Sequence, residues 1–482
     1  MSRLVLTRFV FQMIPIVEIP QLIQHYASAY ESCFSSGAYA HFQRYLSGLL
    51  ICENKTVSGI NQAFVLSPRD QSSLNRFLNQ GRYDLDFLNR VRLDQLQSNP
   101  ATAMRSQGRH RGVLALDDTL LSHVGTHFDH IKPLWDHVEH RHVWAHNLVN
   151  LYYSDESVDY PISYELWKPY DAELIEAGLK EVGIELQAKK YALKESDPDK
   201  WLRYLLGVCQ RRSTSHPEAG KLYRNKIAIG MDLLRQFVAH YPQADLAITF
   251  DSWFCTPKMC AFIDQDLQRA YVGALRIDKA SLILAGSQQQ KMADFIETAR
   301  QAHLSGEKML FRPAHVSFRG NTHTTYCYCK THRLKHYGRV KLLLCYTKED
   351  LSDEPRVYIT NQTHWQAATI SRVYRHRWPV EPFHQQAKAQ GLGKYQMRNW
   401  QAIERHVFFV VIAFSMLTLA RKDPELLKKL SLKPDAAEKS IAFWRRLIKA
   451  HSLIAIVQWI LVAQKQGLTW EAMIQPLMNA YL

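Results

Sequence analysis

The sequence lacks the features that mark secreted and membrane proteins. Eight cysteines in 482 residues are too few for a disulfide framework, so we expect a reduced cytosolic protein. No secretion signal is visible, because the first residues contain neither a clean apolar run nor a small-residue cleavage site. The longest apolar stretch, residues 407–420, is shorter than the about 20 residues of a membrane-spanning helix, and it predicts a buried core helix.

Acidic residues are also scarce. The chain has 45 Asp and Glu against 60 Lys and Arg, a net charge of +15, and such an excess attracts polyanions such as nucleic acids. Charge alone does not identify the polyanion, since ribosomal and membrane-surface proteins are similarly basic. The apolar content of 46% is enough for buried cores and excludes a disordered protein, and the length predicts about two to four domains.

The N-terminal region has the apolar spacing of helices. Within it, a turn at Ser67-Pro68 joins two short predicted helices. They form either a helix-turn-helix that reads DNA or part of an ordinary helical bundle, and the sequence leaves both interpretations open.

Strand patterns begin after this helical region. The predicted order is three strands, the second and third at 146–154 and 159–167, then helix, strand, helix, strand. This order indicates a mixed α/β sheet covered by helices. A stretch of short β segments follows, and a helical pattern resumes near Trp365. The predicted regions are therefore 1–108 (helical), 109–277 (sheet and helices), 278–360 (β-rich), 361–425 (helical, with the apolar stretch) and 426–482 (helical).

Three acidic residues stand out by position. Asp118, which follows Asp117, and Asp251 each close a predicted strand, and Glu381 lies on a late helix. Strand ends deliver side chains into a crevice, where several carboxylates repel one another unless cations lie between them. Mg²⁺ suits such a site because it prefers oxygen ligands. Each of the three acids, taken alone, is better explained as a turn former or helix cap, and only the set together indicates a site.

Basic and aromatic residues surround the glutamate. Tyr374, Arg377, Glu381 and Lys388 follow one another at spacings that place them near one face of a helix. The proline at 382 is tolerated only if the helix begins close to Pro379. Tyr374 and Arg377 are therefore expected on a preceding turn.

These residues resemble a known family, the bacterial insertion-sequence transposases of the DDE superfamily. The pattern Tyr374-x₂-Arg377-x₃-Glu381-x₆-Lys388 matches the family motif at every position, and "LALDDT", "TFDSWF" and "YLSGLL" resemble its two aspartate strands and its helical N-terminal region. The resemblance implies an RNase H-like catalytic core interrupted by a β-rich insertion, which residues 278–360 would supply.

The resemblance also implies roles for the residues. Asp118, Asp251 and Glu381 would be the catalytic metal ligands for two Mg²⁺ ions, with Mn²⁺ able to substitute. The family's threonine after the first aspartate favours Asp118 over Asp117, and neighbouring strand residues face opposite ways, so only one of the two can be a ligand. The implied DNA-binding residues are Tyr374, Arg377 and Lys388.

The implied activity is cut-and-paste transposition: strand cleavage at the ends of an element, followed by joining to target DNA. The implied partners are double-stranded DNA and a second copy of the chain, in the bacterial cytoplasm at the nucleoid and without a membrane. Residues 1–108 would bind the element ends. Two rival functions remain, a catalytically silent DNA-binding protein derived from a transposase and a structure-selective nuclease on the same fold.

Three further groups of residues allow two interpretations each. The set His323, Cys327, Cys329 and His332 suits zinc or one structural strand, and the strand is favoured because the usual Cys-x₂-Cys turn is missing. Eight histidines lie between His110 and His146, and we expect them to line the cleft or the DNA surface rather than bind a metal. For the tryptophans Trp365 and Trp378, core positions are favoured over stacking on a displaced base.

Overall fold

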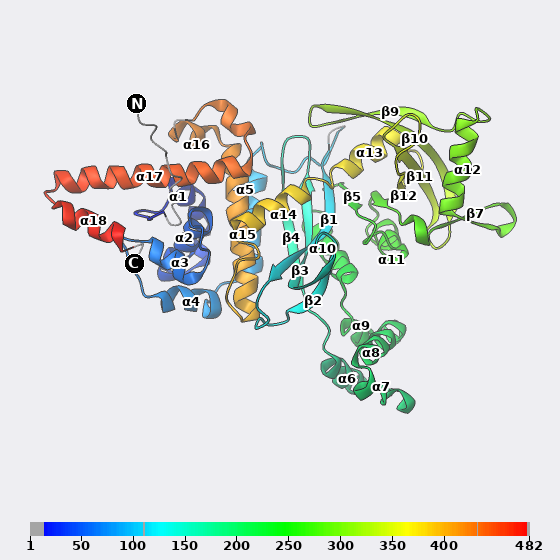
Figure 1. The fold of residues 1–482 in the computed structure, drawn as a ribbon, viewed down its shortest axis with the longest axis horizontal. Coiled ribbons are helices and arrows are strands. Elements are labelled where there is room, and N and C mark those ends of the chain that lie inside the picture. The colour runs from blue at the N-terminus through cyan, green and yellow to red at the C-terminus, as the bar shows by residue number, and fades with distance from the viewer. Residues whose placement is uncertain (1–13, 109–110, 431, 480–482) are drawn as a thin grey trace, which may run out of the picture.

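The computed structural model describes residues 14–108, 111–430 and 432–479. The chain is a mixed α/β protein with a continuous 12-stranded sheet. Figure 1 shows a helical body on the left, a central group of strands, and a second β region on the right. Sheet and helices are thus arranged as predicted from the sequence, with a helical N-terminal region, an RNase H-like core and a β-rich insertion.

The central group contains six strands that follow one another in the chain: β1 (Val113–His123), β2 (Lys132–Asp136), β3 (Arg141–Ser154), β4 (Asp159–Trp167), β5 (Ala247–Phe250) and β6 (Tyr271–Ala274). β1 lies between antiparallel β3 and parallel β5, and β5 pairs with parallel β6. β2 and β4 pair with β3 on its other side. Antiparallel strands followed by a parallel pair are the strand arrangement of an RNase H-like sheet.

Different helices cover the two faces of the central strands. Leu116 of β1 points toward α10 (Lys226–His240), where it approaches Gly230 closely. Val113 points the other way and clusters with residues of α13 (Ala367–Arg375). Successive side chains of a strand alternate between faces, so β1 presents its even-numbered residues to α10 and its odd-numbered residues to α13.

The insertion extends the sheet rather than forming a separate one. β12 (Arg356–Thr360) pairs with β6, and the order continues through the earlier strands of the insertion. The sequence indicated these β segments but not the helix α12 (Met292–Leu304) beside them. The remaining strands of the insertion are β7 (Ser281–Ile283), β8 (Gln289–Lys291), β9 (Arg312–Phe318), β10 (Asn321–Leu334) and β11 (Gly338–Tyr346).

The N-terminal helices pack around a late helix, α15 (Trp400–Arg421), which contains the predicted apolar stretch. Phe42 and Phe77, for example, contact the ring of Phe409. α15 is long and apolar enough to cross a membrane, but 94% of its apolar window is buried inside the protein, so the predicted core helix is confirmed. The N-terminal helices are α1 (Gln21–Ala27), α2 (Ser36–Ile51), α3 (Val57–Ala63), α4 (Gln71–Gln80) and α5 (Leu85–Ser98).

A buried arginine joins this helical body to the sheet. Arg92 of α5 is 1% exposed, and its guanidinium donates hydrogen bonds to the carbonyl oxygens of Pro161 and Ile162 on β4 and to the Ser415 hydroxyl on α15. A buried charge is tolerated when its donors are used in this way. The N-terminal helices and the sheet therefore share one core.

The C-terminal helices are α16 (Pro424–Lys429), α17 (Ile441–Lys465) and α18 (Trp470–Met478). α17 also passes the length and composition test for a membrane span, but only 17% of its apolar window is buried. Leu453, Ile454, Val457 and Leu461 are among its exposed apolar side chains. Contiguous exposed apolar surface of this kind marks an interaction site.

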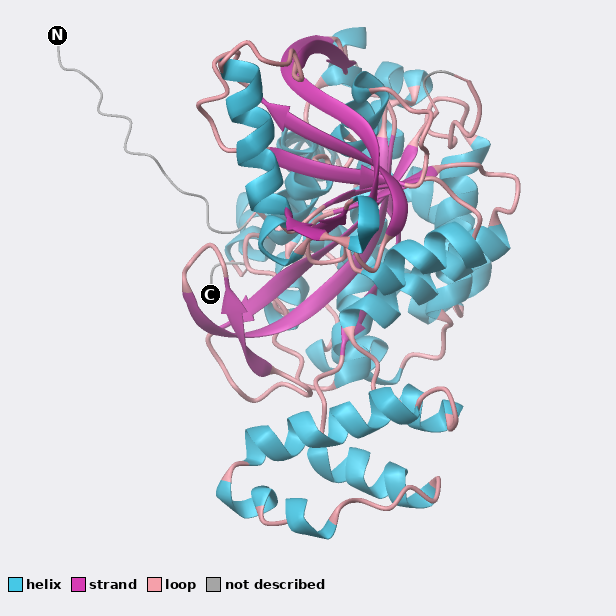
Figure 2. Cartoon of the chain, turned by 90° about the vertical axis from the view of Figure 1, so that its right-hand side faces the viewer, coloured by secondary structure: helices cyan, strands magenta, loops and turns pink. Residues whose placement is uncertain are grey.

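A small helical unit, which was not predicted from the sequence, separates β4 from α10. Figure 2 shows it projecting from the rest of the protein at the bottom of the view. It has a core of its own around the buried Trp201, with Leu205 and Cys209 among the packed residues. Its helices are α6 (Ala172–Glu181), α7 (Leu193–Ser196), α8 (Pro198–Arg212) and α9 (Pro217–Lys221).

Candidate active site

Two adjacent aspartates lie in the middle of β1. The prediction that this strand closes at Asp118 is wrong, because β1 continues to His123 in register with β3. Its pairing with β5 ends one residue before Asp117, opposite Phe250. Asp117 and Asp251, the next residue on each strand, therefore leave the parallel ladder at the same level of the sheet.

The two aspartates of β1 point to opposite faces, each toward a cation. On the α10 face, Oδ2 of Asp118 accepts hydrogen bonds from the Asn147 amide at 2.5 Å and the Lys226 ammonium at 2.9 Å. On the α13 face, Oδ2 of Asp117 accepts from Nη1 of Arg377 at 2.7 Å. Because successive side chains of β1 point to opposite faces, Lys226 and Arg377 contact the two aspartates from opposite sides of the sheet.

Arg377 connects Asp117 to the predicted third acid. Glu381 lies in the first turn of α14 (Val380–Gln390), and Nη2 of Arg377 donates to its Oε1 at 2.5 Å. Arg377 itself lies in the turn between α13 and Pro379, as predicted, whereas Tyr374 lies on helix α13 and not on the turn. A guanidinium that binds two carboxylates through different nitrogens fixes their relative position.

Two carboxyl groups of the crevice, Asp117 and Asp251, have raised pKa values, mainly because they are buried. Burial raises the pKa of Asp117 to about 7, with repulsion from Asp251 and Asp118 adding to the shift and Arg377 opposing it. Burial also raises the pKa of Asp251, although the backbone N–H of Phe254 donates a hydrogen bond to it and so lowers the pKa. Buried carboxyl groups with raised pKa values in one crevice mark a candidate functional site.

The donors themselves suit a hard divalent cation, but Asp118 points to the α10 face, whereas Glu381 shares Arg377 with Asp117 on the α13 face. Asp118, Asp251 and Glu381 offer only carboxylate oxygens, the ligands that Mg²⁺ prefers, and the raised pKa of Asp251 indicates that added positive charge would be favourable there. As the described side chains stand, no three His, Cys, Asp or Glu groups are close enough together to hold an ion. Lys226 and Arg377 supply the positive charge instead.

A cavity of about 680 Å³ opens beside Arg377. Aromatic side chains lie at its wall, including Tyr374 and Trp378, and the Trp378 side chain is 60% exposed. A positive, partly aromatic cavity is suited to nucleic acid, whose phosphates and bases bind such groups. The lining arginines are Arg319, Arg356, Arg375, Arg377 and Arg421.

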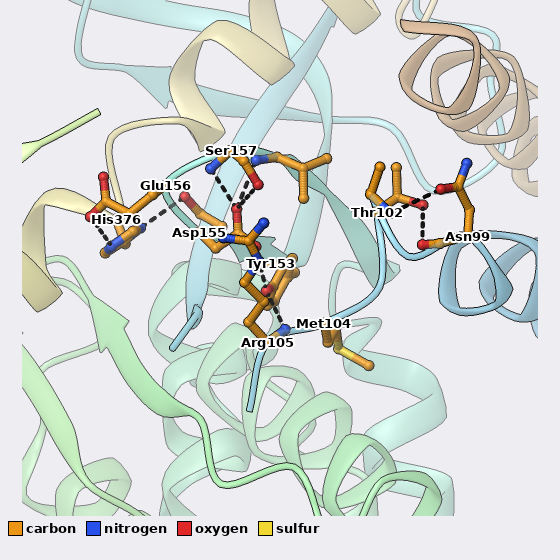
Figure 3. A network of polar contacts seen from close by, with 12 residues as sticks. Asn99, Thr102, Met104, Arg105, Tyr153, Asp155, Glu156, Ser157 and His376 are labelled. Carbon is orange, nitrogen blue, oxygen red and sulfur yellow. Dashed lines mark hydrogen bonds and ion pairs between the residues drawn. The ribbon is translucent and has the colours of Figure 1, made fainter. Parts of the chain in front are cut away.

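A polar network holds the turn between α13 and α14 against the sheet. His376, next to Arg377, is 1% exposed, and its Nδ1 lies 3.1 Å from the Ser154 hydroxyl at the end of β3. Its Nε2 lies 3.8 Å from Glu156 (Figure 3). The backbone N–H of Arg319, at the β9–β10 tip, donates to the same Glu156 carboxylate at 2.6 Å. The β3–β4 turn therefore meets both the turn between α13 and α14 and the insertion.

The four candidate zinc ligands lie on one strand of the insertion. Cys327, Cys329, His323 and His332 all lie on β10, which confirms the strand interpretation. Successive side chains of a strand point to opposite faces, and His332 points to the face opposite the other three. The four side chains therefore cannot meet at one ion. Lys388 is exposed on α14.

The tryptophan and histidine predictions have mixed outcomes. Trp365 is 9% exposed, as expected for a core residue, whereas the exposed Trp378 is not in the core, because it follows α13 in the turn that faces the cavity. His146 is buried and contacts the Tyr395 hydroxyl at 2.6 Å, so it belongs to the core rather than to a surface. His110 lies outside the described residues.

Three residues near the acids were not found from the sequence: Asn147, Lys226 and Trp253. Trp253 follows Asp251, its ring is 4.8 Å from the Lys226 ammonium, and its side chain is 51% exposed. A lysine in the first turn of a helix opposes the helix dipole, and this was the signal that could have identified Lys226.

Comparisons with known families agree with this geometry. A family model described as DDE superfamily endonuclease matches residues 29–314, which is more than half of the 482 residues. A second model, described as transposase DDE domain, matches residues 223–416. The two matched ranges together contain every acidic residue discussed above. No curated protein matches the chain.

Proposed function

Because the chain belongs to the DDE superfamily of endonucleases and transposases, we propose that it is a cut-and-paste DNA transposase. It would cleave strands at the ends of an element and join the resulting 3′-hydroxyl to target DNA. The observation that supports the proposal is that Arg377 joins an acid of β1, Asp117, to Glu381 of α14 beside an arginine-lined cavity. A silent DNA-binding derivative would not need the acids, and a nuclease would not join ends.

In this proposal Asp118, Asp251 and Glu381 hold two Mg²⁺ ions, for which Mn²⁺ can substitute. Bound there, such ions would supply Lewis-acid stabilisation of phosphoryl transfer and a more acidic water. The protein's own task is to hold the three carboxylates. Hydrogen bonds from the backbone N–H groups of Trp253 and Phe254 fix Asp251 at 3.0 and 3.1 Å, and Arg377 fixes Glu381.

Basic side chains then position the DNA. Arg377 lies between the acids and the cavity, so it can contact a phosphate next to the bond that is cleaved. Tyr374 supports it, since its ring lies 5.7 Å from the guanidinium. Lys388, seven residues after Glu381, is roughly 10.5 Å further along the helix axis, which suits contact with a neighbouring phosphate rather than with the reacting atoms.

Other parts of the chain would complete the assembly. Residues 1–108 include α3 and α4, two short helices joined by a loop, and we assign binding of the element ends to them. The exposed apolar face of α17 would be covered by a second copy of the chain, because an excision complex has two ends to hold. Such an enzyme would work at the bacterial nucleoid.

Conservative substitutions test the metal ligands. Asp118→Asn, Asp251→Asn and Glu381→Gln each remove a ligand charge with little change of shape. Each should abolish strand cleavage in Mg²⁺ while binding to the element ends persists. Glu218→Gln, at an exposed residue of α9, is the matched control and should cleave normally.

The outcomes discriminate among the functions. Near-normal cleavage by any of the three variants would remove that residue from the ligand set. Activity in Asp118→Asn, with loss in Asp117→Asn, would move the first ligand by one residue. Cleavage without joining of a 3′-hydroxyl end would favour a nuclease, and binding without either reaction would favour a silent DNA-binding protein.

A further inference from the structure

Two thiols face each other in the β-rich insertion. Cys327 of β10 lies directly opposite Cys345 of β11 in the antiparallel register, and their Sγ atoms are 3.1 Å apart. Directly opposite residues of antiparallel strands have Cα separations of about 4.5 or about 5.5 Å, and a disulfide bond accepts separations of about 4.4–6.8 Å. Because an S–S bond is about 2.05 Å long, the sulfur atoms need to approach by only about 1 Å, with the strand register unchanged.

The two strands hold this pair of thiols in place. The register between β10 and β11 runs without a shift from Tyr326 to Leu334, and each of the two cysteines is 5% exposed. All eight cysteines of the chain are free thiols, so the pair is reduced in this structure. Two groups that are already held in contact react with each other much faster than the same groups free in solution, because their approach and orientation are fixed beforehand.

The surroundings of the pair favour one thiolate and one thiol. A hydrogen bond from the Cys345 thiol lowers the pKa of Cys327, burial opposes this shift, and the Thr325 hydroxyl, 3.4 Å from the sulfur, lowers the pKa further. The pKa of Cys345 is raised, mainly because this thiol keeps its proton for the hydrogen bond to Cys327. The thiolate is the nucleophilic form of cysteine, so Cys327 is the attacking group of the pair.

A small oxidant can reach the pair from the cavity beside Arg377. Cys345 and Thr325 both line this cavity of about 680 Å³. Two cationic side chains of the same lining lie near the Cys345 sulfur: Arg356 is its cross-strand neighbour on β12, and Arg375 of α13 interacts with it electrostatically. Positive groups next to a thiol are typical of reactive cysteines, whereas inert structural cysteines lie in apolar surroundings.

We propose that Cys327 and Cys345 form a redox-sensitive dithiol, which hydrogen peroxide converts to a disulfide between β10 and β11 at the cavity wall. The Cys327 thiolate attacks one peroxide oxygen, the O–O bond breaks, a sulfenic acid forms, and the departing hydroxide takes up a proton to give water. The Cys345 sulfur then attacks the Cys327 sulfur. The S–S bond forms, the S–O bond breaks, and the hydroxyl leaves with the Cys345 proton as a second water. The two thiols lose two electrons, and the peroxide gains them.

The disulfide closes the β10–β11 hairpin covalently, because the two cysteines are 18 residues apart in the sequence. A cross-link of this kind limits opening of the hairpin. It also removes the S–H group with which Cys345 approaches the Ser371 hydroxyl of α13 at 4.0 Å. Oxidation therefore stiffens the wall of the cavity on the side of the insertion. The inference depends neither on transposition nor on a metal ion.

Peptide mapping of the full-length protein is the first test. The reduced protein is exposed to hydrogen peroxide, unfolded, alkylated at its remaining thiols, digested and analysed by mass spectrometry. Two of the eight thiols should escape alkylation, in one cross-linked pair of peptides that contains Cys327 and Cys345 and that dithiothreitol separates. Cys345→Ala should lack the cross-link. Cys329→Ala, two residues from Cys327 on the same face of β10, is the matched control and should retain it.

Amide hydrogen exchange is the second test. Residues 326–346 should exchange more slowly in the oxidised than in the reduced wild type, and peroxide should cause no such difference in Cys345→Ala. Equal exchange in both states of the wild type would refute the stiffening of the hairpin.

The peptide map of the wild type decides the proposal without relying on the folding of any variant. Alkylation of all eight thiols after peroxide treatment, or sulfinic acid on Cys327 without a cross-link, would overturn it. Loss of the cross-link in Cys329→Ala would also overturn it, since Cys329 would then be the partner of Cys345. None of these results bears on the proposed transposase function, which depends on other residues.

Discussion

Acid should weaken the contact between the α13–α14 turn and the sheet through His376. This side chain is 1% exposed, and burial lowers its pKa from 6.5 to about 3, with Arg372 and Arg319 adding to the shift. The facing acid, Glu156, is 3.8 Å from Nε2, too far for a good hydrogen bond, so burial dominates. His376 therefore stays neutral in the folded protein when an unfolded histidine would be charged.

The unfolding free energy depends on pH because the pKa of His376 differs between the folded and the unfolded chain. Below pH 6.5 the unfolded chain binds a proton at this position and the folded chain does not, so stability falls as the pH falls from 6.5 toward about 3. Each pH unit in that window costs about 1.4 kcal/mol of unfolding free energy. Between about pH 7 and about pH 5, His376 should therefore cost about 2 kcal/mol.

The assay is urea unfolding at about pH 7 and about pH 5 for the wild type and His376→Gln. Glutamine retains a hydrogen-bonding group for Ser154 but does not titrate, so the variant should lose about 2 kcal/mol less than the wild type over this interval. His240→Gln, at an exposed residue of α10, should behave like the wild type. An equal loss in His376→Gln and in the wild type would refute the reasoning.

Three further predictions concern other parts of the chain. Lys388→Ala should slow cleavage or joining and make the salt dependence of DNA binding shallower by about one unit; wild-type rates with an unchanged slope would exclude the phosphate role. Leu461→Glu, on α17, should shift the protein toward monomer in light scattering, whereas Leu174→Glu, at another exposed apolar residue, should not. Trp201→Ala should unfold the α6–α9 unit with a loss of about 3–5 kcal/mol, and hydrogen exchange should increase there but not in α15; faster exchange in both would show that the unit shares the main core.

The sequence predicted elements well where local signals and tertiary pairing agree. The strand predicted at 159–167 has the same bounds as β4, because turn residues flank it and its buried residues pair with β3. The end of β1 was misplaced because two consecutive aspartates look like a strand end. Their pairing with β3, opposite Val149 and Asn150, is a tertiary contact that the local sequence does not reveal.

The missed helical unit had local signals. Asp171 caps α6 and Asp197 caps α8, and Pro198 stands at the first position of α8, the position that favours proline in a helix. These signals were sufficient to predict helices between β4 and α10. The core around Trp201 was harder to predict, because the apolar residues of short helices identify a face but not its partner.

The acidic residues of the candidate site were predicted from the sequence, whereas their contacts with Lys226 and Arg377 were not, and the difference has a physical cause. Carboxylates at strand positions and the spacing around Glu381 are local patterns, so one sequence can indicate them. Their cationic partners are set by tertiary structure: Lys226 is 108 residues from Asp118, and Arg377 is 260 residues from Asp117. No local pattern relates residues so far apart.

The placement of the two cations offsets the repulsion among the acids of the crevice. The alternation of β1 directs Asp117 to the α13 face and Asp118 to the α10 face, and each face supplies one positive group, Arg377 or Lys226. Each aspartate therefore has an opposite charge in contact, and fewer carboxylates repel one another at full strength.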